Sequence, residues 1–224
     1  MCENDTQDNF KQNKETETYI NKLNCSGFSN KNGNEILILL DYRKNLINIP
    51  EDIYESNEPN DVILAYYNRF TPITYIHITI YDKTICIEYI KTNEKYQNKG
   101  YCKLLISILL VLSKKIIPNI NIIHLDSINY NLSYLCIFTF GAIPQNLYYK
   151  DNLYSTNIKE DDIKDDDKIA KFNKELAVIA DKTKEEQYKY IKSFDAKFGN
   201  DLFLIIDIDD SFIDVMQDLI NNYI

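Results

Sequence analysis

The stretch Ile90-Lys91-Thr92-Asn93-Glu94-Lys95-Tyr96-Gln97-Asn98-Lys99-Gly100-Tyr101-Cys102 connects a strand-like segment to a helix-like segment. In such a polar, glycine-containing loop, successive backbone N–H groups point toward one spot, where the positive end of the helix dipole also lies. This arrangement suits an anion such as a pyrophosphate, and Lys99 and Lys103 would add positive charge. A plain strand-to-helix connection with solvated lysines is the alternative.

The segments on either side of this loop have clear periodicities. Residues 73–81 alternate, with isoleucines on one face, and predict a strand that pairs with residues 84–92 through a turn at Asp82-Lys83. Residues 101–117 predict a helix, because apolar side chains recur at helical spacing before Pro118. The apolar residues of that helix are Leu104, Leu105, Ile108, Leu109, Leu112 and Ile116.

Further elements are expected along the rest of the chain. Gly141 is a suitable end for the helix over 131–140, and Ser211 with Asp214 is typical of a capping box. The other expected strands are 35–42, 61–68, 120–127 and 202–208, with a strand pair within 145–157 and one or two helices over 169–198.

The composition is that of a globular chain. Of 224 residues, 45% are hydrophobic and the net charge is −9, which disfavours disorder and argues against nonspecific binding to nucleic acid. No apolar run approaches the roughly 20 residues of a membrane span. The acidity is concentrated late in the chain, since residues 151–224 hold 10 lysines and arginines against 18 acidic residues. We therefore expect a flexible polar tail at 1–34, a main domain at 35–157 and an acidic extension at 158–224.

The cysteines indicate a reducing compartment. There are five, widely spaced and without a CxxC pair, which favours free thiols and a cytoplasmic location. With only His77 and His124 as histidines, no metal site is expected.

The order of these elements resembles the GNAT superfamily of acyl-CoA-dependent N-acetyltransferases. Its signature is Gln or Arg, two residues, Gly, one residue, then Gly or Ala, and this chain has Gln97 to Cys102 between a strand and a helix. The resemblance covers residues 61–144. It implies an α+β fold with a mixed central sheet flanked by helices, in which the parallel strands 84–92 and 120–127 splay apart to admit acyl-CoA.

The resemblance also implies roles for individual residues. The backbone of Ile90 and Thr92 would pair with the pantetheine arm, which Asn131 would also contact. The pyrophosphate would be held by the loop and the helix start, namely Gln97, Asn98, Lys99, Gly100, Tyr101, Cys102 and Lys103.

The chain departs from the family pattern at three positions. Cys102 stands where Gly or Ala is usual, and Ala142 where Phe is usual. Ile137 occupies the place of the tyrosine that often protonates the CoA thiolate. Tyr134, one helical turn earlier, is a candidate for that catalytic role or else a core tyrosine.

Glu88 is the best candidate for a catalytic base, which an amine needs before it attacks a thioester. It is the only carboxylate within residues 84–92, on the face expected to hold Cys86 and Ile90. Burial among apolar neighbours raises a carboxyl pKa toward neutrality. An edge-facing or salt-bridged glutamate is the alternative.

The resemblance implies transfer of an acetyl group from acetyl-CoA to a primary amine on a small molecule or a peptide. A noncatalytic GNAT-like module that binds CoA or a protein partner is the alternative. The last strand and helix would suit a dimer contact.

Overall fold

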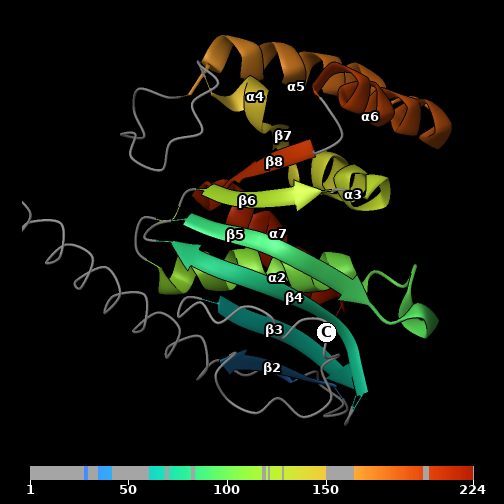
Figure 1. Ribbon diagram of the computed structural model, residues 1–224. Helices are drawn as coiled ribbons and strands as arrows, with labels where there is room; N and C mark the ends of the chain where they lie inside the picture. The colour runs from blue at the N-terminus through green and yellow to red at the C-terminus, as the bar shows by residue number, and fades with distance from the viewer. Residues whose placement is uncertain are drawn as a thin grey trace, which may run out of the picture. The chain divides into compact units, whose positions relative to one another are not determined.

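The computed structural model describes most of the chain in two compact units (Figure 1). The first unit comprises residues 1–122 with 208–224, and the second comprises residues 123–207. The described residues are 28–29, 35–41, 61–68, 71–81, 84–117, 120, 122–127, 129–149, 164–198 and 202–223. Most of the expected N-terminal tail, the Asp82-Lys83 turn and the expected boundary near residue 158 lie outside them.

Among its described residues, the first unit contains five strands, each antiparallel to the next along the chain. They are β1 (Phe28–Ser29), β2 (Glu35–Asp41), β3 (Asp61–Asn68), β4 (Thr71–Tyr81) and β5 (Thr84–Thr92). The hairpin expected over 73–92 is confirmed. In β4, Ile78 on one face and Thr79 on the other are both buried, so this strand lies in the interior although its sequence alternates.

A β-bulge interrupts the pairing of β4 with β5. Ile78 lies opposite Ile87 and His77 lies opposite Tyr89, which leaves Glu88 as the extra residue of β5. Residues directly opposite one another share a face of the sheet. Because of the bulge, Ile90 returns to the face of Ile87, and the expectation that Cys86 and Ile90 share a face is wrong.

Helix α2 (Tyr101–Ile116) is the centre of the first unit. It packs on β3, β4 and β5, and α7 (Asp210–Tyr223) packs on α2 (Figure 1). Ile106 and Leu110, outside the expected apolar face, are therefore buried as completely as Leu105 and Leu109. The hydroxyl of the buried Ser107 donates to the backbone oxygen of Lys103 at 2.9 Å, so no polar group of that side chain is left unsatisfied.

Over the ranges that the structure describes, the second unit combines three strands with four helices. It consists of β6 (Ile122–Ser127), α3 (Tyr130–Phe140), β7 (Ile143–Pro144), α4 (Gln145–Tyr148), α5 (Asp166–Ala180), α6 (Lys184–Phe198) and β8 (Leu202–Asp207). β8 pairs antiparallel with β7 and neighbours β6. Gly141 ends α3 with a φ of 62°, as expected. The strand pair expected within 145–157 is wrong over 145–148, where the Tyr149 N–H closes one helical turn onto Gln145 at 3.1 Å.

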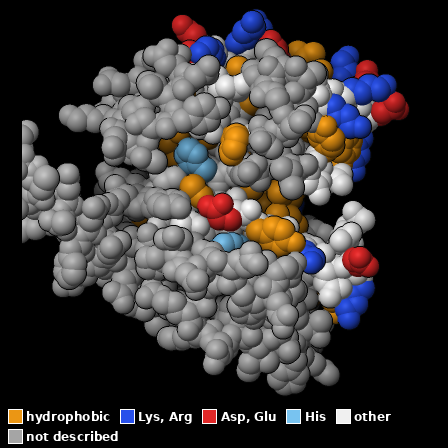
Figure 2. Space-filling model, viewed as in Figure 1, with side chains coloured by type: hydrophobic (Ala, Val, Ile, Leu, Met, Phe, Trp, Pro, Cys, Tyr) orange, Lys and Arg blue, Asp and Glu red, His pale blue; other side chains and the backbone are white. Residues whose placement is uncertain are grey.

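The acidic third of the chain does not stay apart as one segment. Its strand β8 belongs to the second unit and its helix α7 to the first. Positive and negative side chains alternate over the surface of α5 and α6 (Figure 2). Within the described ranges, no helix has the length and hydropathy to cross a bilayer.

Helix α7 is capped by Asp209 and not by the expected pair Ser211 and Asp214. The Asp209 carboxylate accepts hydrogen bonds from the Ser211 hydroxyl at 2.7 Å and from the Phe212 N–H at 2.6 Å. These bonds hold the pKa of Asp209 below its ordinary value. A depressed folded-state pKa stabilises the fold above the unfolded-state value, and the effect is lost as the pH falls through the folded-state value.

We predict that Asp209→Ala lowers the free energy of unfolding by about 1 kcal/mol at pH 7, because the capping oxygen is lost. Asp209→Asn retains an oxygen acceptor, so its free energy of unfolding should remain closer to that of the wild type. Urea denaturation from pH 7 to pH 3 measures both variants. If the difference in free energy of unfolding between the wild type and Asp209→Ala did not become smaller toward pH 3, the cap would not depend on the charged carboxylate.

Candidate functional site

The loop between β5 and α2 is anchored to the hairpin that precedes it. It contains a short 3-10 helix, Glu94–Tyr96, which the sequence analysis did not anticipate. The Asn93 N–H donates to the Ile73 carbonyl at 2.9 Å, and the Gln97 side-chain amide donates to the Thr92 carbonyl at 3.1 Å. The first residue of the expected signature, Gln97, therefore holds the loop against the end of β5.

Two residues with a left-handed backbone conformation lead from this loop into helix α2. Asn98 has a φ of 59° and Gly100 a φ of 85°, a conformation that glycine adopts without steric cost. The Gly100 carbonyl accepts the first helical hydrogen bond, from the Leu104 N–H at 2.9 Å. No side chain caps α2 and no acidic residue lies in its first turn. Since the first N–H groups of a helix lack intrahelical acceptors, this end of α2 can accept an anion.

Positive charge and aromatic rings surround the loop. The ammonium groups of Lys95 and Lys99 lie 5.3 and 5.5 Å from the centre of the Tyr96 ring, and both side chains are exposed. Tyr96 meets Tyr101 edge to face at 6.0 Å. Tyr101 also contacts Tyr66 at 5.7 Å, so its ring joins the start of α2 to β3. Charged side chains at this loop are visible in Figure 2, at the position of the loop that follows β5 in Figure 1.

Two cysteines lie near this region and neither is poised as a nucleophile. Burial raises the pKa of the Cys102 thiol to about 12. Burial and then the charge of Glu88 raise the pKa of Cys86 to about 11. Both thiols are therefore protonated at neutral pH. The structure gives neither of these two cysteines a disulfide bond.

The candidate base Glu88 is exposed at the bulge, rather than enclosed by apolar neighbours as the sequence analysis assumed. Further along β5, the Thr92 hydroxyl lies 2.9 Å from the Thr74 hydroxyl. The roles of Glu88 as base and of the Ile90 and Thr92 backbone in holding pantetheine stay predictions.

In the second unit, Tyr134 is held by α6. Its hydroxyl donates to the side-chain oxygen of the buried Gln187 at 2.7 Å, and its ring stacks on Tyr188 at 4.8 Å. The Gln187 amide group in turn donates to the carbonyls of Ala180 and Lys182. This network gives Tyr134 a structural role, as in the alternative of a core tyrosine, while its catalytic role stays a prediction.

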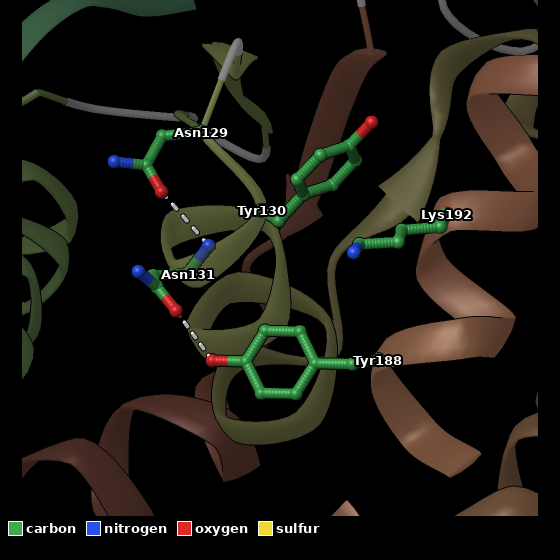
Figure 3. A pocket seen from close by; sticks show the side chains of 5 residues that line it. All are labelled: Asn129, Tyr130, Asn131, Tyr188 and Lys192. Carbon is green, nitrogen blue, oxygen red and sulfur yellow. Dashed lines mark hydrogen bonds between the residues drawn. The ribbon is translucent and has the colours of Figure 1, made fainter. Parts of the chain in front are cut away.

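Asn131 borders an open hollow of about 500 Å³ between α3 and α6 (Figure 3). The Tyr188 hydroxyl donates to the Asn131 side-chain oxygen at 2.5 Å. Asn129, Tyr130 and Lys192 complete the lining. No local pattern in the sequence predicts these partners, because α6 is separated from Asn131 by more than fifty residues.

Other polar side chains of the second unit have structural partners. Burial lowers the pKa of His124, whose ring nitrogen lies 3.4 Å from the Tyr149 hydroxyl. Asp207, at the end of β8, forms an ion pair with Lys164 at 2.7 Å. In the part of the chain that the structure describes, no group of three or more His, Cys, Asp or Glu side chains could hold a metal ion.

Solved acetyltransferase structures resemble this fold. The ribosomal-protein-S18-alanine N-acetyltransferase from Escherichia coli is 12% identical over 72% of this chain and 79% of its own, with a TM-score of 0.41. A Bacillus subtilis acetyltransferase in complex with CoA is 14% identical, over 71% and 84%, with a TM-score of 0.39. The IAA acetyltransferase from Bacillus cereus ATCC 14579 is 12% identical, over 78% and 99%, with a TM-score of 0.40. No protein-family model and no curated protein matches the sequence.

The chain has an α+β fold with strands and helices in both units. Its elements follow the expected order: antiparallel strands that end in the β4–β5 hairpin, the signature loop, α2, β6 and α3. The expected splayed pair would consist of β5 from one unit and β6 from the other, and its geometry stays a prediction.

The raised thiol pKa values predict slow chemical modification. At pH 7, Cys86 and Cys102 should react with iodoacetamide at least tenfold more slowly than in the urea-unfolded chain, and faster as the pH approaches 11. Peptide mass spectrometry measures each cysteine separately. Rapid labelling of Cys102 at pH 7 would contradict the burial of its thiol.

Proposed function

We propose that this protein is a GNAT-type N-acetyltransferase that moves an acetyl group from acetyl-CoA to a primary amine. The observation that carries the proposal is the start of α2, where a left-handed Gly100 opens an uncapped helix without an acidic first turn. This donor set fits a pyrophosphate, because anions favour the N-terminal end of a helix. Lys99 and Lys103 are near enough in sequence to add charge, and Asn98, Tyr101 and Cys102 supply further backbone N–H groups.

Acetyl-CoA supplies an activated thioester, whose carbonyl carbon the amine nitrogen attacks as the C–S bond breaks and CoA leaves as a thiolate. The attacking amine must be neutral and the product must lose one proton. Glu88 is the proposed acceptor of that proton. Its exposed position at the bulge supports the proposal, because the carboxylate can reach a substrate or a water without leaving the sheet.

The proposed substrate is a small-molecule or peptide amine, and candidates include polyamines, aminosugars and lysine-bearing peptides. The acidic composition favours a cationic acceptor, since clefts of one charge raise the local concentration of the opposite charge. A noncatalytic module that binds CoA is the second candidate. It is favoured by Cys102 and Ile137, which depart from the family pattern, and by the structural hydrogen bond of Tyr134.

We predict that acetyl-CoA at a hundredfold excess over its Kd raises the melting temperature by about 5 °C or more, because it binds the folded chain alone. Gly100→Glu should abolish the shift by placing a carboxylate at the anion site. Gly141→Glu is the matched control, since Gly141 is also left-handed and no atom lies within 4 Å of an added Cβ. If acetyl-CoA still raised the melting temperature of Gly100→Glu, the cofactor would not bind at this loop.

We further predict that Glu88→Gln lowers kcat/KM roughly a hundredfold at pH 7 and alters the acidic limb of the pH–rate profile, because the amide cannot accept a proton. CoA thiol release on a panel of spermidine, glucosamine and a lysine peptide measures the rates. Glu94→Gln, with the same charge change on the exposed 3-10 helix, is the control. An unchanged profile in Glu88→Gln would exclude Glu88 as the base. Binding of acetyl-CoA without turnover of any amine on the panel would favour the noncatalytic module.

A further inference from the structure

The β-bulge in β5 brings two consecutive side chains, Glu88 and Tyr89, to one face of the sheet. Cys86 lies opposite Thr79, Tyr89 lies opposite His77, and Glu88 is the extra residue between the two pairs. Side chains alternate between the faces along a strand, so Cys86 and Glu88 point to the same side. Tyr89 also lies on that side, because its partner His77 shares a face of β4 with Thr79.

Two further observations agree with this placement. Burial and then the charge of Glu88 raise the pKa of the Cys86 thiol to about 11, so the carboxylate lies near that thiol. The centre of the Tyr89 ring lies 6.2 Å from that of Tyr75, two residues before His77 on the same face of β4. Figure 2 shows an acidic side chain next to hydrophobic side chains at the position that β5 has in Figure 1. All of these residues belong to the first unit.

Both side chains are open to solvent. Tyr89 is 40% exposed, whereas Ile85 and Ile87, on the opposite face of β5, are buried. Glu88 is exposed as well, and it forms no ion pair with another described residue. A ligand can therefore reach the carboxylate and the neighbouring ring together.

Tyr75 supports the Tyr89 ring from one side. Tyr75 is only 4% exposed, and the planes of the two rings are inclined by 32°. A supported ring loses little freedom when a ligand binds, and the face of its π system attracts cations. An ammonium group at this point would meet the charge of Glu88 and the ring of Tyr89.

The charges on this face favour a cation at one end of it. Glu88 supplies a negative charge, and the protonated thiol of Cys86 adds none. Lys91 lies on the same face, opposite Tyr75, and brings a positive charge to the other side of Tyr89. Since like charges repel, an incoming cation is drawn to the Glu88 side of the Tyr89 ring.

We propose that Glu88 and Tyr89 form a binding site for an alkylammonium group, and that Tyr89 is a residue that selects the acetyl acceptor. An alkylamine, like the lysine side chain, is cationic at neutral pH and fits a carboxylate beside an aromatic ring. The proposal rests on the proposed function for one point only, the identity of the bound amine as the acceptor of the acetyl group.

Butylammonium is a suitable probe, with butan-1-ol as the uncharged control of similar shape. Titration of the ¹⁵N-labelled full-length chain, at constant ionic strength and without acetyl-CoA, should shift the amide signals of residues 86–90. Butylammonium should bind at least about fivefold more tightly than butan-1-ol, because only the cation is attracted by the carboxylate and the ring. Equal binding of the two probes, or no shift of these signals at about 100 mM butylammonium, would overturn the proposal.

Variants of Tyr89 test the contribution of the ring. Tyr89→Leu should weaken butylammonium binding about threefold, whereas Tyr89→Phe keeps the ring and should bind as the wild type does. Phe203→Leu is the matched control, because Phe203 is also 40% exposed but lies on β8 in the second unit, and its binding should be unchanged. If Tyr89→Leu bound butylammonium as tightly as the wild type, the ring would have no part in the site and the proposal would fail.

A second pair of variants tests the charge. Glu88→Gln should weaken butylammonium binding about threefold or more, because the attraction between opposite charges is lost. Glu94→Gln makes the same charge change on the exposed 3-10 helix and should have little effect. Equal weakening in the two variants would show a general effect of net charge and would contradict a cation bound at Glu88.

Because the titration contains no acetyl-CoA, its outcome is separate from that of acetyl transfer. Butylammonium binding by a chain that acetylates no amine would support this site and exclude the proposed function. If the chain acetylates spermidine, Tyr89→Leu should raise KM and leave kcat nearly unchanged, since the ring binds the ground state and the transition state alike. An unchanged KM in Tyr89→Leu would exclude Tyr89 as a residue that selects the acceptor.

Discussion

The burial of α2 is the constraint on which the first unit depends. Burying seven successive residues, from Leu104 to Leu110, removes both sides of the helix from water, with strands on one side and α7 on the other. Such a helix has little freedom to rotate or slide, because close-packed interiors tolerate few voids. The direction of its first turn is consequently fixed, and with it the place where an anion can meet the helix. Gly100, with its left-handed backbone conformation, makes the turn that connects the loop after β5 to this helix.

The bulge in β5 has a comparable effect on the candidate base. A regular strand would continue the alternation through Glu88 and move Ile90 to the face opposite Ile87. The extra residue restores Ile90 to the face of Ile76, its partner in β4, and leaves Glu88 exposed and outside the pairing. A sheet can thus keep its apolar packing and still present one carboxylate, which is a common use of bulges near active sites.

In the second unit, hydrogen bonds join side chains that lie far apart in the chain. Gln187 is buried, and its three hydrogen bonds tie Tyr134 to the turn between α5 and α6. The next residue, Tyr188, fixes the amide of Asn131. A tyrosine that the sequence offers as an acid is engaged by a glutamine, and an asparagine offered to pantetheine lines the hollow between α3 and α6.

Periodicity and turn chemistry determined most elements by themselves, because they depend on neighbours within a few residues. Local sequence patterns predict four elements in this way: the helix after Gly100, the 73–92 hairpin, the Gly141 cap and the strand of 202–207. The tertiary structure alone decided the bulge at Glu88, the covering of α2 by the C-terminal helix and the hydrogen bond from Tyr188 to Asn131. Each of these depends on contacts between residues distant in the chain, whose pairing follows from packing and hydrogen bonding in three dimensions and leaves no local pattern in the sequence.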